Sequence, residues 1–131
     1  DMAYAGMPFA PAGTPIPPSY ILQFWLPLED VDETTGCMHF VPGVHRRPLL
    51  PHHVSGGSPD ESTRLLAIDQ PEKHLDLATA RACPLRRGGA TAHGYGTPHY
   101  TSPNRSSTRH RRAYIFNFAD PERIDLSHRS A

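Results

Sequence analysis

Lysine is almost absent from this chain, and no charge of either sign dominates it. Lys73 is the only lysine, and 13 basic residues balance 13 acidic ones, so the formal net charge is zero. A bulk charge that would attract nucleic acid or an anionic membrane is therefore missing. No apolar run is long enough to span a bilayer, and no segment has the pattern of a signal peptide. We expect a cytoplasmic protein that binds neither nucleic acid nor membrane.

Cysteine is equally scarce. Cys37 and Cys83 are the only two cysteines, they lie far apart, and neither belongs to a C-x-x-C motif. Their number and spacing argue against a disulfide scaffold. The chain also lacks the paired cysteines of a zinc finger. Two free thiols in a reduced compartment are the expectation.

Long helical patterns are missing as well, whereas residues that form turns are abundant. The chain has 15 prolines and 10 glycines, about a fifth of its 131 residues, and an apolar fraction of 37% that is too large for disorder. The best helical pattern, residues 72–82, has only a weak 3.6-residue period, and we expect its first half to be a turn. The sequence therefore predicts an all-β domain of short strands.

Several segments have the alternation, or the β-branched and aromatic content, that is typical of strands. The loops between them include the acidic turn 29–36 and the long loop 44–62. Seven or so short strands predict a sandwich or barrel, for which a jelly roll is the main candidate. The segments named as strands are 19–28, 37–43, 63–68, 78–85 and 113–118, and Gly88 and Gly89 mark a tight turn before the last third of the chain.

The first expected strand contains one polar residue. Gln23 shares a face with Ile21 and Trp25, and the opposite face is made of Leu22, Phe24 and Leu26. Because both faces are largely apolar, we expect a strand that is buried on both sides. A buried amide needs hydrogen-bond partners, so Gln23 is either a structural bridge or a contact to a ligand.

Nine histidines suggest a metal site, although most of them are expected to be loop residues. His39 has apolar neighbours and fits a core or rim position, while His52 and His53 diverge on an extended backbone. The sequence has no G-x-S-x-G elbow and no glycine-rich phosphate loop that opens a helix. The arginine-rich segment 105–112 could contact nucleic acid, yet it lacks interleaved aromatics and lies in a neutral chain.

Three segments, taken in order, resemble a known family. They are Asp1-Met-Ala-Tyr; WLPLEDVDETTGCMHFVPGVHRRPLLPHH, residues 25–53; and GGATAHGYGTPHYTSPNRSSTRHRRAY, residues 88–114. With these segments the chain resembles the phytanoyl-CoA dioxygenase family of iron(II)/2-oxoglutarate-dependent oxygenases. The resemblance implies a double-stranded β-helix, or jelly roll, over residues 1–118. We expect this domain to lack its N-terminal part and to end in a polar tail, residues 119–131.

The resemblance also implies an iron site. The family holds Fe(II) with two histidines and one carboxylate, which leaves positions open for 2-oxoglutarate and O₂. Asp1 and His99 match the carboxylate and the distal histidine of this set. The first histidine would lie two residues before Asp1, outside this sequence. His93 lies where the family tolerates other residues, so we expect an ordinary structural role for it.

An arginine after the distal histidine binds the far carboxylate of 2-oxoglutarate in this family, since a planar guanidinium suits a carboxylate. Arg111 is the expected match, with Arg112 and Arg109 as the alternatives. Thr101 and Asn104 match the family's His-x-Ser-x-x-Asn pattern, with threonine in place of serine.

Other residues of the resemblance surround this site. Thr101 and Asn104 would order the loop or contact the co-substrate, and a plain turn is the alternative for both. Gln23 and Trp25 face the expected barrel interior and would line the co-substrate pocket. Asn104 and His45 would stand behind the residues that touch the iron and the co-substrate.

The implied activity is hydroxylation of an aliphatic C–H bond in a small-molecule substrate, with conversion of 2-oxoglutarate to succinate and CO₂. Asp1 favours hydroxylation, because related halogenases have a small residue at this position. The alternative is a non-catalytic jelly-roll binding module, or an inactive family member without the first histidine. Loops 1–18 and 44–62 are expected to form the rim that selects the substrate.

Overall fold

The computed structural model describes residues 11–15, 21–56 and 65–123, which form eight β-strands and three short helical segments. The first sheet has the strand order β6-β1-β8, the second has the order β5-β2-β7, and β3 pairs with β4. All of these pairings are antiparallel. The strands are β1 (Ile21–Pro27), β2 (Met38–Phe40), β3 (His52–Gly56), β4 (Leu65–Ile68), β5 (Arg81–Cys83), β6 (Thr91–Gly94), β7 (His99–Thr101) and β8 (Ala113–Ala119); the helical segments are η2 (Val44–Arg46), α1 (Pro71–His74) and η3 (Leu77–Thr79).

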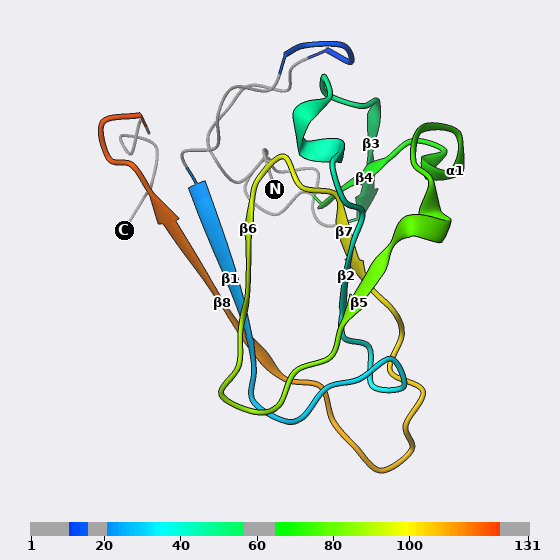
Figure 1. The fold of residues 1–131 in the computed structure, drawn as a ribbon, viewed down its shortest axis with the longest axis vertical. Helices are drawn as coiled ribbons and strands as arrows, with labels where there is room; N and C mark the ends of the chain where they lie inside the picture. The colour runs from blue at the N-terminus through cyan, green and yellow to red at the C-terminus, as the bar shows by residue number, and fades with distance from the viewer. Residues whose placement is uncertain (1–10, 16–20, 57–64, 124–131) are drawn as a thin grey trace.

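The chain crosses repeatedly between the two three-stranded sheets, which face each other in Figure 1. Each central strand, β1 or β2, is flanked by strands that follow much later in the sequence. The last crossings run from β6 in the first sheet to β7 in the second and back to β8 in the first. This connectivity confirms the predicted all-β jelly roll.

The register of β1 determines which side chains of the first sheet face the interior. Gln23 pairs with His93 on β6 and with Asn117 on β8, and Trp25 pairs with Thr91. Paired residues of neighbouring strands project to the same face of a sheet. Gln23, Trp25, Thr91 and His93 are all buried, so this face of the sheet forms one wall of the interior.

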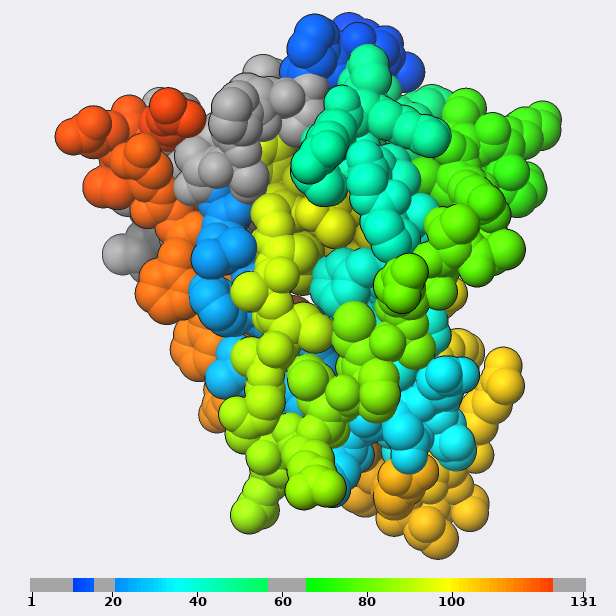
Figure 2. Space-filling view, in the orientation of Figure 1, coloured from blue at the N-terminus to red at the C-terminus, as the bar shows by residue number. Residues whose placement is uncertain are grey.

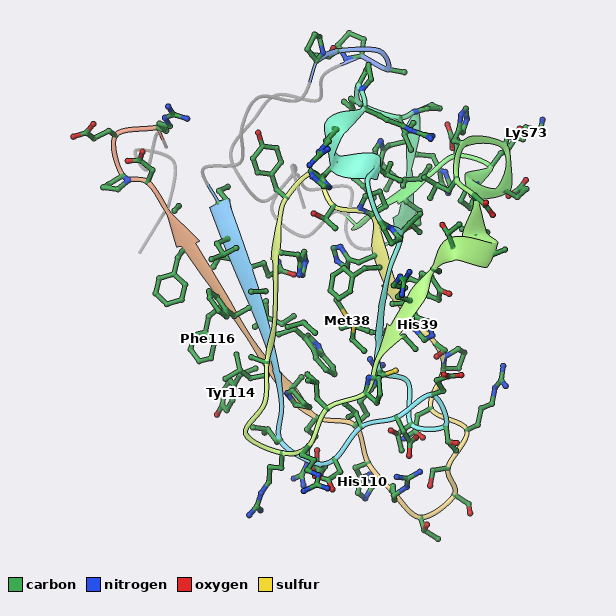
Figure 3. The ribbon with its side chains drawn as sticks, in the orientation of Figure 1. Met38, His39, Lys73, His110, Tyr114 and Phe116 are labelled. Carbon is green, nitrogen blue, oxygen red and sulfur yellow. The ribbon has the colours of Figure 1, made fainter. Side chains whose placement is uncertain are left out.

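The opposite face of the first sheet is exposed among the described residues, so the expectation of a strand buried on both sides is wrong. Leu22 is 42% exposed and its partner Phe118 is 62% exposed. Tyr114 and Phe116 point away from the second sheet in Figure 3. Alternation along the strand sends these side chains outward whatever their chemistry, so their apolar character could not reveal which face is covered.

One apolar cluster joins the two sheets. Trp25, Val31, Cys37 and Met38 are buried in it, and four partly buried residues pack against them: Phe40, Ala82, Leu85 and Ala113. Figure 2 shows side chains filling the space that the ribbon leaves between the sheets. Burial of roughly 200 Å² of aromatic surface at about 25 cal/mol per Å² contributes about 5 kcal/mol, so Trp25 is a major stabilising residue.

The acidic turn between β1 and β2 is held by Asp32 and by a glycine. Oδ1 of Asp32 accepts hydrogen bonds from the backbone N–H groups of Thr34 and Thr35, at 2.9 and 3.0 Å. Gly36 has a φ of 87°, and a Cβ there would overlap the carbonyl oxygen of Ser102, just after β7. The expected turn is confirmed, and glycine at position 36 allows the chain after β7 to lie directly against it.

The other predicted elements differ from the structure at their ends. The predicted loop 44–62 contains η2 and β3, and the predicted strand 78–85 is reduced to β5 with η3 before it. Tertiary contacts explain this, because Val44 joins Val41 and Leu75 in a second buried cluster, and β5 follows β2 for only three residue pairs. A short helix, α1, lies where the first half of residues 72–82 was predicted to be a turn. Strand β8 extends to Ala119, one residue beyond the predicted strand 113–118.

Within the ranges that the structure describes, no helix is long and apolar enough to cross a membrane.

We predict that Gly36→Ala destabilises the fold much more than Gly43→Ala does. Both glycines have positive φ, 87° and 78°, which costs an L-residue roughly 1–2 kcal/mol. A Cβ at position 43 meets nothing within 4 Å, whereas one at position 36 collides with backbone. Urea unfolding, followed by Trp25 fluorescence, should show a loss of about 1–2 kcal/mol for Gly43→Ala and at least double for Gly36→Ala. Equal losses would contradict the close approach at Ser102.

Candidate functional site

His99 is held in a form that can ligate a metal. It begins β7, and its Nδ1 lies 2.9 Å from the carbonyl oxygen of Thr97. A carbonyl only accepts, so Nδ1 carries the proton of this bond, and Nε2 of the neutral ring has the lone pair. Burial lowers the pKa of His99 to about 4. The ring is therefore neutral near pH 7, as a metal-binding imidazole must be.

His93 lies directly against this ring. The ring centroids of His93 and His99 are 4.3 Å apart, and His93 is only 5% exposed. Burial lowers the pKa of His93 to about 4 as well. From the sequence, His93 was expected to have an ordinary structural role. The alternation of Thr91, His93 and Tyr95 was visible in the sequence, and these three residues are all buried. The ring that His93 contacts, however, belongs to His99 in the other sheet.

The three arginines that could bind the 2-oxoglutarate carboxylate lie just before β8 and differ in their surroundings. Arg109 donates from Nη1 to Oδ2 of Asp32 at 2.9 Å, and Arg112 donates from Nε to Oε1 of Glu29 at 2.6 Å. These partners lower the pKa values of both carboxyls, mainly through the side chain of Arg109 for Asp32 and the backbone N–H of Arg112 for Glu29. Both alternatives are thus engaged at the exposed end of the molecule.

Arg111 differs from its two neighbours. Its side chain is half-buried, and its Nε is buried without a hydrogen-bond partner among the residues the structure describes. This Nε lies 3.5 Å from the place of a Cβ on Gly36, so it is close to the turn between β1 and β2. A buried guanidinium N–H that lacks a partner costs free energy unless a ligand accepts from it. Arg111 therefore fits a carboxylate anchor better than Arg109 or Arg112 does.

Three further residues, Thr101, Trp25 and Thr91, are at least half-buried. Thr101 is half-buried and pairs with Met38, and Trp25 is 5% exposed. Thr91, the partner of Trp25 on β6, has a buried hydroxyl oxygen with no hydrogen-bond partner in the described part of the chain. Thr91 was not predicted at the site from the sequence. The sequence does not reveal that Thr91 lies opposite Trp25, because this depends on the pairing of β1 with β6.

Of the other predicted residues, Gln23 and Asn104 make hydrogen bonds within the fold. Nε2 of Gln23 donates to Oδ1 of Asn117 at 3.0 Å. Gln23 thus forms a structural bridge between β1 and β8, one of the two roles expected for it. Asn104 orders its loop as expected, because its Nδ2 donates to the carbonyl of Arg109 at 2.8 Å. His45 is exposed on η2. Asp1 lies outside the described residues.

The residues of the interior suit iron and a dicarboxylate. A neutral imidazole is a ligand for Fe(II), and a guanidinium with an unused buried donor is a partner for a carboxylate. Among residues 11–15, 21–56 and 65–123, no three His, Cys, Asp or Glu side chains come together as a metal site.

Acid should destabilise the protein as the pH falls from 6.5 to about 4. Burial lowers the pKa of His93 and of His99 from 6.5 to about 4. In this window the unfolded chain binds more protons than the folded one, so stability rises with pH across it and is fully present above it. We expect the urea midpoint, measured by Trp25 fluorescence, to fall on acidification through this range.

The matched variants for this measurement are His93→Phe and His45→Gln. His93→Phe removes one of the two buried titrating rings, so its midpoint should fall less steeply. His45 is exposed, and its replacement should leave the slope unchanged. A slope in His93→Phe equal to that of the unmodified protein would show that the neutral buried ring does not contribute.

Comparison with known proteins identifies the family. Residues 4–113 match the family phytanoyl-CoA dioxygenase (PhyH). No curated protein matches this chain.

Several solved structures are similar to the chain. EvdO2 from Micromonospora carbonacea var. aurantiaca, complexed with 2-oxoglutarate, is 35% identical with a TM-score of 0.62, and the match covers 81% of this chain and 44% of EvdO2. The non-heme monooxygenase ThoJ is 25% identical with a TM-score of 0.58, over 77% of this chain and 33% of ThoJ. The epimerase SnoN, in complex with Fe³⁺, alpha ketoglutarate and nogalamycin RO, is 25% identical with a TM-score of 0.51, over 92% of this chain and 52% of SnoN. The chain thus spans about half or less of these proteins. Since the family match extends over most of its length, the chain belongs to the phytanoyl-CoA dioxygenase family.

Proposed function

We propose that this chain contributes the co-substrate-binding part of an iron(II)/2-oxoglutarate-dependent dioxygenase. The observation that carries the proposal is Arg111, whose buried Nε has no hydrogen-bond partner among the described residues. Arg109 and Arg112, by contrast, are paired with acidic residues. The 2-oxoglutarate in the EvdO2 complex and the Fe³⁺ in the SnoN complex support the same co-substrate and metal.

Each proposed residue has a distinct task. His99 and Asp1 bind the iron together with a histidine two residues before Asp1, and Arg111 binds the far carboxylate of 2-oxoglutarate. Bound iron(II) supplies the centre at which O₂ and 2-oxoglutarate react. Thr101, Trp25 and Gln23 line the pocket, and the apolar cluster around Trp25 keeps water away from it.

The proposed reaction is hydroxylation of an aliphatic C–H bond of a small molecule in the cytoplasm, with succinate and CO₂ as products. Hydroxylation rests on the carboxylate of Asp1. The similar structures include a monooxygenase and an epimerase, and an epimerised product without hydroxylation would contradict the proposed reaction. Segment 44–56, which carries η2 and β3, is the proposed part of the substrate rim within the described residues.

His99→Ala is expected to abolish 2-oxoglutarate turnover, because it removes an iron ligand. The assay is succinate formation by the full-length protein with Fe(II), O₂ and 2-oxoglutarate. His39→Ala is the control, since His39 stacks on Tyr100, with ring centroids 4.7 Å apart, at a strand position that alternates away from the interior. Full turnover in His99→Ala would contradict the ligand assignment. Binding of 2-oxoglutarate without turnover in the unmodified protein would favour the non-catalytic binding module.

Arg111→Ala is expected to raise the KM for 2-oxoglutarate, while Arg112→Ala leaves it nearly unchanged. A hydrogen bond between charged groups is worth about 1.5–3 kcal/mol, which corresponds to roughly a 10- to 100-fold change in affinity. Arg112 is the matched control because its ion pair with Glu29 is exposed on the arginine side. If Arg112→Ala raised the KM for 2-oxoglutarate and Arg111→Ala did not, Arg112 would be the residue that binds the far carboxylate.

A further inference from the structure

His93 and His99 form a contact between the two sheets at the candidate iron site. His93 comes from β6 in the first sheet and His99 from β7 in the second. Their ring centroids are 4.3 Å apart, and their planes are inclined by 55°. His93 precedes His99 closely in the chain, yet the contact depends on how the two sheets pack, because the two residues belong to different sheets.

Phe40 completes the packing around these two rings. It pairs with His99 in the register of β2 and β7. Its ring centroid lies 5.1 Å from that of His93 and 6.0 Å from that of His99. Three rings from three strands are therefore in mutual contact, and His93 touches both of the others.

The ring of His99 is restrained in two independent ways. The hydrogen bond to the carbonyl of Thr97, 2.9 Å long, holds one edge of the ring. The contacts with His93 and Phe40 limit its tilt. A ligand side chain that is already ordered loses less conformational entropy when the metal binds, and groups that orient a metal-binding histidine strengthen metal affinity.

We propose that His93 is a positioning residue for His99, and that it acts through the packing of its ring. The inference rests on the proposed function, in which His99 binds iron. It adds a requirement at a residue to which the family pattern gives no role: the imidazole of His99 is aimed by a ring from the opposite sheet. Because the effect comes from the shape of the ring, an aromatic hydrocarbon of similar size can replace it.

The test is anaerobic Fe(II) affinity of the full-length protein, measured by calorimetry in the presence of 2-oxoglutarate. We expect His93→Ala to weaken Fe(II) binding roughly 10- to 100-fold, the range for groups that orient metal-binding histidines. His93→Phe should restore the affinity to near that of the unmodified protein. His39→Ala is again the matched control, as it removes a stacked histidine from the same sheet as His99, and it should leave the affinity unchanged.

Three outcomes separate the possibilities. Unchanged Fe(II) affinity in His93→Ala overturns the proposal. Equal losses in His93→Phe and His93→Ala also overturn it, because they would show that a ring nitrogen acts directly, as a ligand or as a hydrogen-bonding group. Unchanged affinity in His99→Ala overturns the proposed iron site itself, whatever His93 does. Where the cavity left by alanine prevents folding, His93→Val takes its place with the same expectation.

Discussion

The antiparallel register of β1 between β6 and β8 is the constraint on which the interior of this protein depends. It places Gln23 opposite His93 and Asn117, and Trp25 opposite Thr91. A slip of one residue would turn these side chains outward and bring the exposed apolar face of the sheet inside. The burial of Trp25 between the sheets favours the observed register, since the opposite face has no comparable partner among the described residues.

A second constraint closes the far end of the barrel, where the acidic turn meets the arginine segment. Asp32 holds Arg109 and Glu29 holds Arg112, while Gly36 lets Ser102 approach. These ion pairs are exposed, so each adds little stability by itself. Their consequence is geometric, because Arg109 and Arg112 are anchored at the surface, whereas Nε of Arg111 is buried near Gly36.

The site shows where reasoning from sequence stops. His99 could be named from the family pattern around it, and the hydrogen bond to Thr97 and the burial of its ring fit that role. The choice between Arg111 and Arg112 stayed open, because the two are adjacent and chemically identical. Glu29, 83 positions away in the chain, engages Arg112. His93 was passed over for a related reason, since the ring that it contacts belongs to another sheet.

The sequence by itself determined the all-β character, the acidic turn, the main strands and the residues that resemble an iron and co-substrate site. These depend on composition, on alternation with a period of two and on glycine at tight turns, all of which act between near neighbours in the chain. Only the tertiary structure decided which face of β1 is covered, which of the three arginines form ion pairs, and that His93 packs on His99. The first two depend on contacts between residues distant in sequence, whereas His93 and His99 are near in sequence but belong to different sheets. In each case the geometry is set by strand register and by the packing of one sheet on the other.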